Sequence, residues 1–187
     1  MGKIKTIHQV KIFCGLIYKY DQILEIAKKE LEKKWGIIDI EEGPFPFNFT
    51  AYYEEEMGKN LKRKFISFEK LYLPEKVYEW KIFTNEIEKK LSENEKRKIN
   101  IDPGYIDNSK VILLSTKDYY HRVYLGNGIF AEITLHYSKG KYNFFQWTYP
   151  DYRSENYIKF FLKIREKYRK QINQAEQYEK NVDKNIN

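Results

Sequence analysis

Apolar residues at the start of the chain follow two different patterns. Residues 10–18 are almost entirely apolar, which is typical of a strand buried on both faces. In residues 21–34 the apolar side chains recur every three or four positions, which predicts an amphipathic helix. Asp21 suits its N-cap, and Gly36 suits the left-handed conformation that ends many helices. The chain therefore begins with a strand followed by a helix.

The same two patterns recur up to residue 104. They predict strands at 37–41, at 63–71 and from Lys98, and a helix at 75–92. We expect Asp-Pro-Gly at 102–104 to end the last strand in a turn, because proline and glycine favour turns. The order strand, helix, strand, strand, helix, strand is that of a ferredoxin-like core.

One segment between the predicted strands is rich in aromatic residues and proline. The two prolines of residues 43–47 remove backbone donors, so this segment is excluded from the centre of a sheet. We expect it to be an ordered aromatic loop. The polar stretch 50–58 is expected to hold a helical turn.

The second half of the chain predicts more antiparallel sheet. Residues 110–116 have the composition of a strand, and residues 119–147 predict two consecutive hairpins. Their turns are expected at the Gly-Asn-Gly of 126–128 and around Lys139-Gly140. The predicted sheet is therefore longer than the ferredoxin-like core alone.

The register of the first hairpin follows from its apolar residues. A three-residue loop at 126–128 places Arg122 opposite Glu132, with Tyr120, Tyr124 and Thr134 on the same face. The apolar residues predicted on the other face are Val123, Leu125, Ile129, Ala131, Ile133 and Leu135. We expect Arg122 and Glu132 to form an exposed pair that contributes under about 1 kcal/mol.

A long amphipathic helix is predicted at the end of the chain. Its apolar stripe runs through residues 154–175, whereas residues 177–187 lack apolar content and are expected to form a frayed tail. The prediction is a single α+β domain at 1–176. It has a ferredoxin-like βαββαβ core, extended by antiparallel β-hairpins and closed by a C-terminal helix.

Composition narrows the class of protein. The formal net charge is +7, which permits nucleotide or nucleic acid as a partner. No stretch is long and apolar enough to span a bilayer, and the N-terminus has no signal-peptide pattern, so we expect a cytoplasmic protein with no membrane partner. The one cysteine, Cys14, lies in an apolar run and predicts a buried thiol. The sequence specifies neither a cofactor nor an oligomeric state.

Charged residues gather at turns and on the polar hairpin face in the last third of the chain. Lysine and arginine there can neutralise a phosphate, and a glutamate or histidine can transfer protons. The candidate ligand-binding residues are Asp102, Lys117, Asp118, His121, Arg122, Glu132, Asp151 and Arg153. We expect them to form a site for a phosphate-bearing ligand, a nucleotide or RNA.

Other interpretations of these residues remain open. The cluster can equally be a structural network of ion pairs. An enzyme acting on a small anionic substrate would use Glu132 or His121 as its catalytic proton-transfer group. A metal on Asp102, His121 and Glu132 is conceivable, but their spacing is not diagnostic. The aromatic loop at 43–53 would suit a protein–protein adaptor, and no phosphate-binding P-loop motif is present.

Eight segments spread over the chain carry a family resemblance. They lie at 49–58, 65–69, 84–88, 99–105 (INIDPGY), 115–118 (STKD), 121–125 (HRVYL), 132–135 (EITL) and 147–153 (WTYPDYR). Together they resemble the family described as domain of unknown function 4416. The resemblance covers residues from about 10 to 170 and implies a widespread prokaryotic protein. It implies no activity, substrate or catalytic residue.

Overall fold

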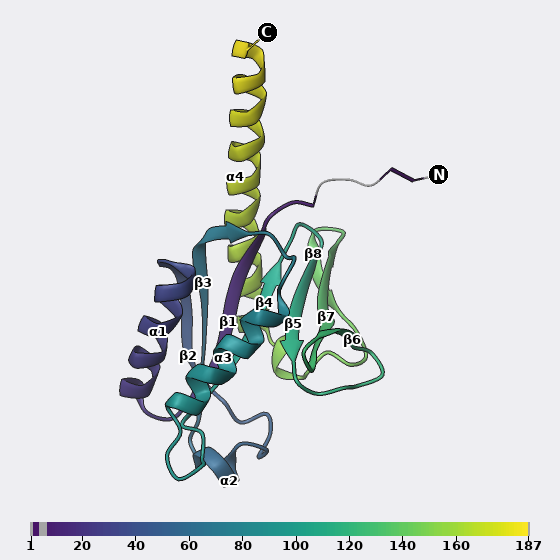
Figure 1. Cartoon of the computed structure of the whole chain (residues 1–187). Helices are drawn as coiled ribbons and strands as arrows, with labels where there is room; N and C mark the ends of the chain where they lie inside the picture. The colour runs from purple at the N-terminus through teal and green to yellow at the C-terminus, as the bar shows by residue number, and fades with distance from the viewer. Residues whose placement is uncertain (1, 4–6, 187) are drawn as a thin grey trace.

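The chain is an α+β protein built on one antiparallel sheet. The computed structural model describes residues 2–3 and 7–186. In this part of the chain the sheet has eight strands, in the order β2-β3-β1-β4-β5-β7-β6 with β8 paired to β7 (Figure 1). The strands are β1 (Val10–Tyr18), β2 (Ile38–Pro46), β3 (Lys62–Tyr72), β4 (Ile99–Ile106), β5 (Lys110–Ser115), β6 (Val123–Gly126), β7 (Ile129–Ser138) and β8 (Lys141–Phe144).

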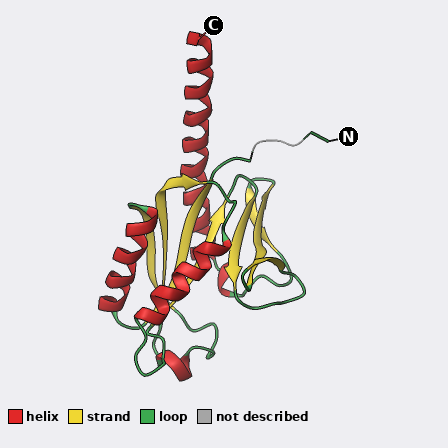
Figure 2. Cartoon of the chain, viewed as in Figure 1, coloured by secondary structure: helices red, strands yellow, loops and turns green. Residues whose placement is uncertain are grey.

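Helices cover both faces of this sheet. Figure 2 distinguishes them from the strands by colour. They are α1 (Asp21–Trp35), α2 (Glu54–Met57), α3 (Tyr78–Lys90), the short 3-10 helix η1 (Asp151–Arg153) and α4 (Glu155–Ile186). The predicted C-terminal helix is confirmed, and Figure 1 shows its last turns projecting beyond the sheet. The frayed tail expected at 177–187 stays a prediction, and residue 187 lies outside the described residues.

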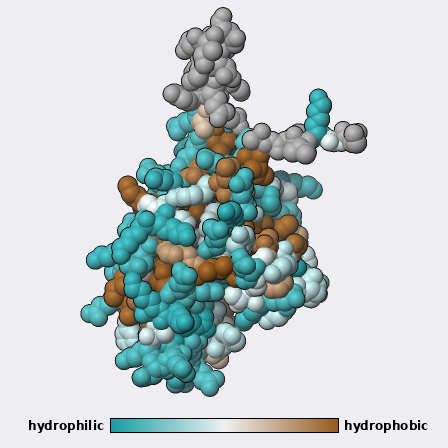
Figure 3. Space-filling model, viewed as in Figure 1, coloured by the Kyte–Doolittle hydropathy of each residue, from teal (hydrophilic) through white to brown (hydrophobic). Residues whose placement is uncertain are grey.

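Two apolar cores lie on the two faces of the sheet. Helices α1 and α3 pack over one face, where Trp35 contacts Phe68 and Trp80 edge-on. Helix α4 packs over the other face through Phe160 and Phe161. Strand β1 lies between the cores and is buried along its whole length, which explains its nearly continuous apolar sequence. The outward side of α1 and α3 is mostly hydrophilic (Figure 3).

A buried polar network fastens α4 to the sheet. The Nζ of Lys11 is 2.6 Å from an oxygen of Asp39 and 2.7 Å from the carbonyl oxygen of Phe68. From α4, Lys167 approaches Asp39 to 2.9 Å and Gln171 accepts a hydrogen bond from Lys11 at 3.1 Å. These side chains satisfy one another, so the network serves the packing of α4.

Two predicted elements begin or end elsewhere than expected. The segment expected as an aromatic loop belongs to β2, which runs to Pro46 at the edge of the sheet. A bulge between Glu42 and Phe45 accommodates Pro44 there, since an edge strand needs fewer backbone donors. Helix α1 has Tyr20 at its N-cap, and the predicted cap Asp21 is its first residue.

The turn predicted at 102–104 is also wrong, because β4 runs straight through it to Ile106. Pro103 pairs with Cys14 of β1, and Gly104 pairs with both Phe13 and Leu113. A Cβ on Gly104 would lie 2.3 Å from the carbonyl oxygen of Ile112, so glycine is required by a close backbone approach. The turn occurs after Ile106 instead.

The first hairpin has the predicted register but a different face for Leu135. Val123 pairs with Ala131, which places Arg122 beside Glu132 as predicted. The expected three-residue loop is a two-residue turn, with a bulge between Tyr124 and Gly126. A further bulge lies in β7 between Ile133 and Leu135, the partners of Ile112 and Val111. It turns the side chain of Leu135 toward the core under α4.

Strands β4 and β5 separate after a short paired stretch. The pairs that join them run from Gly104 with Leu113 to Ile106 with Val111. Beyond Gly104, β4 extends unpaired with β5 to its N-terminal end at Ile99, and beyond Leu113, β5 extends to its C-terminal end at Ser115. We call the opening between these diverging ends the fork. It lies in the middle of the sheet order and positions the candidate site.

Candidate functional site

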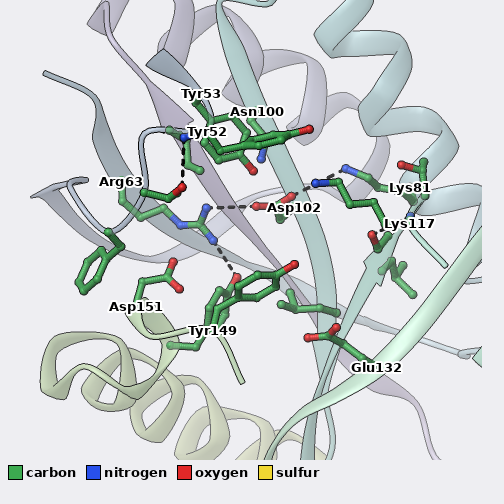
Figure 4. Close-up of a pocket in the computed structure, with 18 of the residues that line it drawn as sticks. Tyr52, Tyr53, Arg63, Lys81, Asn100, Asp102, Lys117, Glu132, Tyr149 and Asp151 are labelled. Carbon is green, nitrogen blue, oxygen red and sulfur yellow. Dashed lines mark hydrogen bonds and ion pairs between the residues drawn. The ribbon is translucent and has the colours of Figure 1, made fainter. Parts of the chain in front are cut away.

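A cavity of about 430 Å³ opens at the fork (Figure 4). Asn100 and Asp102 of β4 form one wall, and residues 113–117 in and after β5 form the opposite wall. The loops 47–53 and 149–152 add further lining residues, and α3 contributes Lys81 and Glu88. The volume falls within the roughly 300–1,000 Å³ that is typical of small-molecule sites.

Five of the eight predicted site residues line this cavity. They are Asp102, Lys117, Arg122, Glu132 and Asp151. The others lie outside its lining: Asp118 is exposed, and Arg153 donates to the carbonyl oxygens of Thr148 and Gln146 at 2.8 and 2.9 Å. These contacts give Arg153 a structural role in shaping its own loop.

Arg122 is held by four acceptors. Its Nε donates to Glu132 at 2.8 Å, and its Nη1 donates to Ser115 Oγ and to the carbonyl oxygen of Lys117 at 2.8 and 2.9 Å. Its Nη2 reaches the hydroxyl of Tyr149 at 3.2 Å. The side chains of Arg122 and Glu132 are 3% and 1% exposed, so the expected surface pair is a buried network.

His121 contacts the same carboxylate from outside the cavity. Its Nε2 is 3.2 Å from Glu132 Oε2, and its ring stacks on Trp147 with centroids 5.3 Å apart. Thr134 donates to the other oxygen of Glu132 at 3.1 Å. Both oxygens of Glu132 therefore have protein partners.

The centre of the cavity holds an arginine that the sequence interpretation missed. Arg63 of β3 is 1% exposed, and its Nη1 lies 3.1 Å from Asp102 while its Nη2 donates to Tyr152 at 2.7 Å. Its Nε has no hydrogen-bond partner among the described residues. Burial alone would raise the pKa of Asp102, but the charges of Arg63 and Lys81 outweigh it and lower that pKa. Asp102 is therefore ionised at neutral pH.

Helix α3 supplies a second missed pair, Lys81 and Glu88. Lys81 donates to the carbonyl oxygen of Ile101 at 2.8 Å and lies 3.7 Å from Glu88. Glu88 accepts from the backbone N–H of Ile101 at 2.6 Å and lies 3.3 Å from Arg97. Burial raises the pKa of Glu88, although the charge of Lys81 acts in the opposite direction. Both residues approach β4 at the point where β5 has separated from it.

Two charged residues in the lining lack an opposite charge. Among the described residues, no carboxylate forms an ion pair with Lys117, whose Nζ lies 4.1 Å from the centre of the Tyr52 ring. Asp151 is 7% exposed and likewise forms no ion pair with any cation that the structure describes. Burial raises the pKa of Asp151, and the nearby charge of Arg63 and hydrogen bonds from the backbone N–H groups of Tyr152 and Asp151 only partly counteract this. Among the lining residues that the structure describes, one cation and one carboxyl group thus have no ion-pair partner.

Exposed aromatic side chains line the same cavity. Their exposed fractions range from 42% for Tyr149 to 60% for Tyr52. The full set is Phe49, Tyr52, Tyr119 and Tyr149. Aromatic faces that remain accessible to solvent can stack on a planar ring of a ligand.

No metal site is evident in the described residues. They contain no group of three or more His, Cys, Asp or Glu side chains that could hold a metal ion, so Asp102, His121 and Glu132 do not form one. Cys14 is buried, and burial raises the pKa of its thiol, which makes it unreactive. None of the helices in the described part of the chain is long and apolar enough to cross a membrane.

Comparisons with known proteins identify one family. A model described as a domain of unknown function (DUF4416) matches residues 8–168, which is most of the chain. Neither the curated proteins nor the solved structures gave a match.

Proposed function

The chain belongs to the DUF4416 family, whose description names no activity, and we propose from the site itself that this protein binds a small phosphate-bearing ligand of nucleotide size. The proposal depends first on Lys117. The other cavity cations all have carboxylate partners, such as Asp102 for Arg63 at 3.1 Å and Glu132 for Arg122 at 2.8 Å. Lys117 has none among the described residues, so its charge is available to a ligand.

The surroundings of Lys117 favour a phosphate with a ring attached. Lys117 lies over Tyr52, and three further exposed aromatic side chains line the cavity. An anionic group at Lys117 and a planar ring against a tyrosine together match a nucleotide. The size of the cavity favours one nucleotide over a longer RNA strand.

The alternative enzyme site at Glu132 or His121 has less support. Glu132 is already bonded to Arg122, His121 and Thr134, so a ligand would have to displace one of them. The adaptor interpretation of residues 43–53 is also weakened, because part of the segment is strand β2 and Phe47 is buried.

We also propose that the first part of the fold is ferredoxin-like. Strands β2, β3, β1 and β4 lie in that spatial order, and every neighbouring pair is antiparallel. Helices α1 and α3 connect them and cover one face. These features support the proposal, with α2 inserted between β2 and β3.

Calorimetric titration with 5′-AMP and 5′-GMP tests the proposed function. We expect wild-type protein to bind at least one of them, and Lys117→Ala to weaken that binding about tenfold or more without changing the melting temperature. Lys29→Ala is the matched control, since Lys29 is an exposed lysine of α1 outside the cavity lining. Absence of binding to both nucleotides, or equal affinity in wild type and Lys117→Ala, would refute the proposal.

A further inference from the structure

Four carboxyl side chains line the cavity, and three of them are already neutralised. Glu88 lies 3.3 Å from Arg97, Asp102 lies 3.1 Å from Arg63, and Glu132 lies 2.8 Å from Arg122. Asp151 is the exception among the described residues. A carboxyl group that is buried without a cation partner is costly, so it calls for an explanation.

The backbone around Asp151 holds the side chain in a defined place. Asp151 follows Pro150 and begins η1, where its carbonyl oxygen accepts a hydrogen bond from the N–H of Ser154 at 3.0 Å. The hydroxyl of the next residue, Tyr152, is fixed by Arg63 at 2.7 Å. The position of Asp151 is therefore set by the fold and does not depend on a ligand.

Groups from several elements face the Asp151 carboxyl. The positive charge comes from Arg63 of β3, and the negative charge comes from Asp102 of β4. Tyr152 of η1 and Tyr157 of α4 also interact with it. The backbone N–H groups of Tyr152 and Asp151 also donate hydrogen bonds to the carboxyl. Arg63 is already shared between Asp102 and Tyr152, so the Asp151 oxygens keep capacity to accept further hydrogen bonds from a ligand.

Lys117 and Asp151 are well separated in the cavity. In Figure 4, Lys117 lies on the far side of Asp102 from Arg63, whereas Asp151 lies near Arg63 on the side of α4. A ligand that reaches both must therefore present an anionic group at one place and hydrogen-bond donors at another. A phosphate next to Asp151 is disfavoured, because two anions would repel each other.

We infer that Asp151 is the specificity-determining residue of the site and accepts hydrogen bonds from the ribose hydroxyls, so that the ligand is a ribonucleotide. The inference rests on the proposed function, in which Lys117 binds the phosphate. The two hydroxyls of a ribose are adjacent donors and match the two oxygens of one carboxylate. In dinucleotide-binding folds an acidic residue likewise accepts a hydrogen bond from the ribose 2′-OH. The exposed aromatic side chains of the cavity can stack on the base, which leaves the ribose for Asp151.

Calorimetric titration with 5′-AMP, 5′-GMP and their 2′,3′-dideoxy counterparts tests the inference. We expect wild-type protein to bind a ribonucleotide about tenfold or more tightly than its dideoxy counterpart, since hydrogen bonds to charged groups are among the strong ones. In Asp151→Asn the preference should fall to about threefold or less. Asp118→Asn is the matched control, because Asp118 is an exposed carboxylate outside the lining, and it should keep the full preference.

The outcomes separate this inference from the proposed function. Equal affinity of wild type for ribo- and dideoxynucleotides overturns the role of Asp151, even if Asp151→Asn proves unstable. A preference that persists in folded Asp151→Asn also overturns it. If either result comes with binding that depends on Lys117, the proposed function stands alone. If none of the four nucleotides binds, both are refuted.

Discussion

Arg122 and Glu132 form a buried ion pair, with Arg122 Nε 2.8 Å from Glu132 Oε2. The Nη1 of Arg122 donates to Ser115 and Lys117, and its Nη2 donates to Tyr149. Arg122 thereby connects β5, the segment after it and the loop at 149–152. The pair shapes the cavity wall, and it leaves neither partner free for a ligand.

Removing Arg122 should destabilise the protein strongly. Breaking a buried pair by deleting one partner costs about 3–5 kcal/mol, because the other charge stays buried and unpaired. We expect Arg122→Ala to lower the melting temperature by on the order of 10 °C. Scanning calorimetry measures this, and the double variant Arg122→Ala/Glu132→Ala should lose less than the sum of the single variants. A shift of only one or two degrees would show that the pair is exposed in solution.

Strands β4 and β5 lie too close together to accommodate a side chain at position 104. In Gly104→Ala the new Cβ would lie 2.3 Å from the carbonyl oxygen of Ile112 and 2.6 Å from the ring of Phe13. Such overpacking costs about 1–3 kcal/mol, which urea unfolding would detect. Gly2→Ala is the control, since nothing described lies within 4 Å of that position, and it should unfold like wild type.

The attachment of α4 should weaken in acid. Burial opposes ionisation of Asp39, but hydrogen bonds from Lys11 and Ser67 outweigh it and lower the pKa of Asp39 below its usual value of 3.8. A lowered folded-state pKa means that the carboxylate contributes its full stability above about pH 4 and loses it as the pH falls through the folded-state pKa. Asp39→Asn should therefore be less stable than wild type at pH 7, and the difference should shrink below pH 4.

Urea unfolding of both proteins between pH 7 and pH 2.5 gives this comparison. Glu155→Gln serves as control, because Glu155 pairs with Lys159 on the exposed surface of α4 and should alter stability little at either pH. A difference between Asp39→Asn and wild type that stays constant down to pH 2.5 would contradict the assignment.

Replacing Asp151 should separate stability from binding. Burial raises the pKa of Asp151, so the folded state favours the protonated form of this carboxyl group. The contribution of the protonated form to stability is lost as the pH rises through the folded-state pKa. Asp151→Asn removes the cost of ionising the buried carboxyl group, and we expect its melting temperature at pH 7 to equal or exceed that of wild type. A clear loss of stability would instead mean that the carboxylate supports the fold.

Periodicity was sufficient to predict most elements but not where β4 ends. Apolar spacing predicted the helices and the order of the strands, because burial of one face leaves a regular pattern. The local preference of Pro103 and Gly104 for turns predicted a break. Pairing with β1 overrides that preference, because Pro103 pairs with Cys14 of β1. Pro103 itself lies outside the stretch of β4 that pairs with β5. Such long-range pairing is not visible in a local pattern.

The site was predicted in part, and the missed residues carry a readable signal. Lys81 and Glu88 occupy positions of α3 that fall on its buried stripe, beside Trp80 and Ile87. Arg63 has the same parity in β3 as the buried Phe65. Charged residues at positions that should be apolar indicate a buried polar site. Arg63 and Lys81 both approach Asp102 beside the fork, and no spacing in the sequence reveals this.

The fork also gives the molecule a mechanical weak point. The two parts of the sheet are joined there by three residue pairs, whereas β1 and β3 are paired over nearly their whole length. A ligand bound between Asp102 of β4 and Ser115 of β5 would contact both strands where they are not paired with each other. Ligand binding would then make the sheet more rigid, and backbone amides of β4 and β5 on both sides of the fork would exchange more slowly.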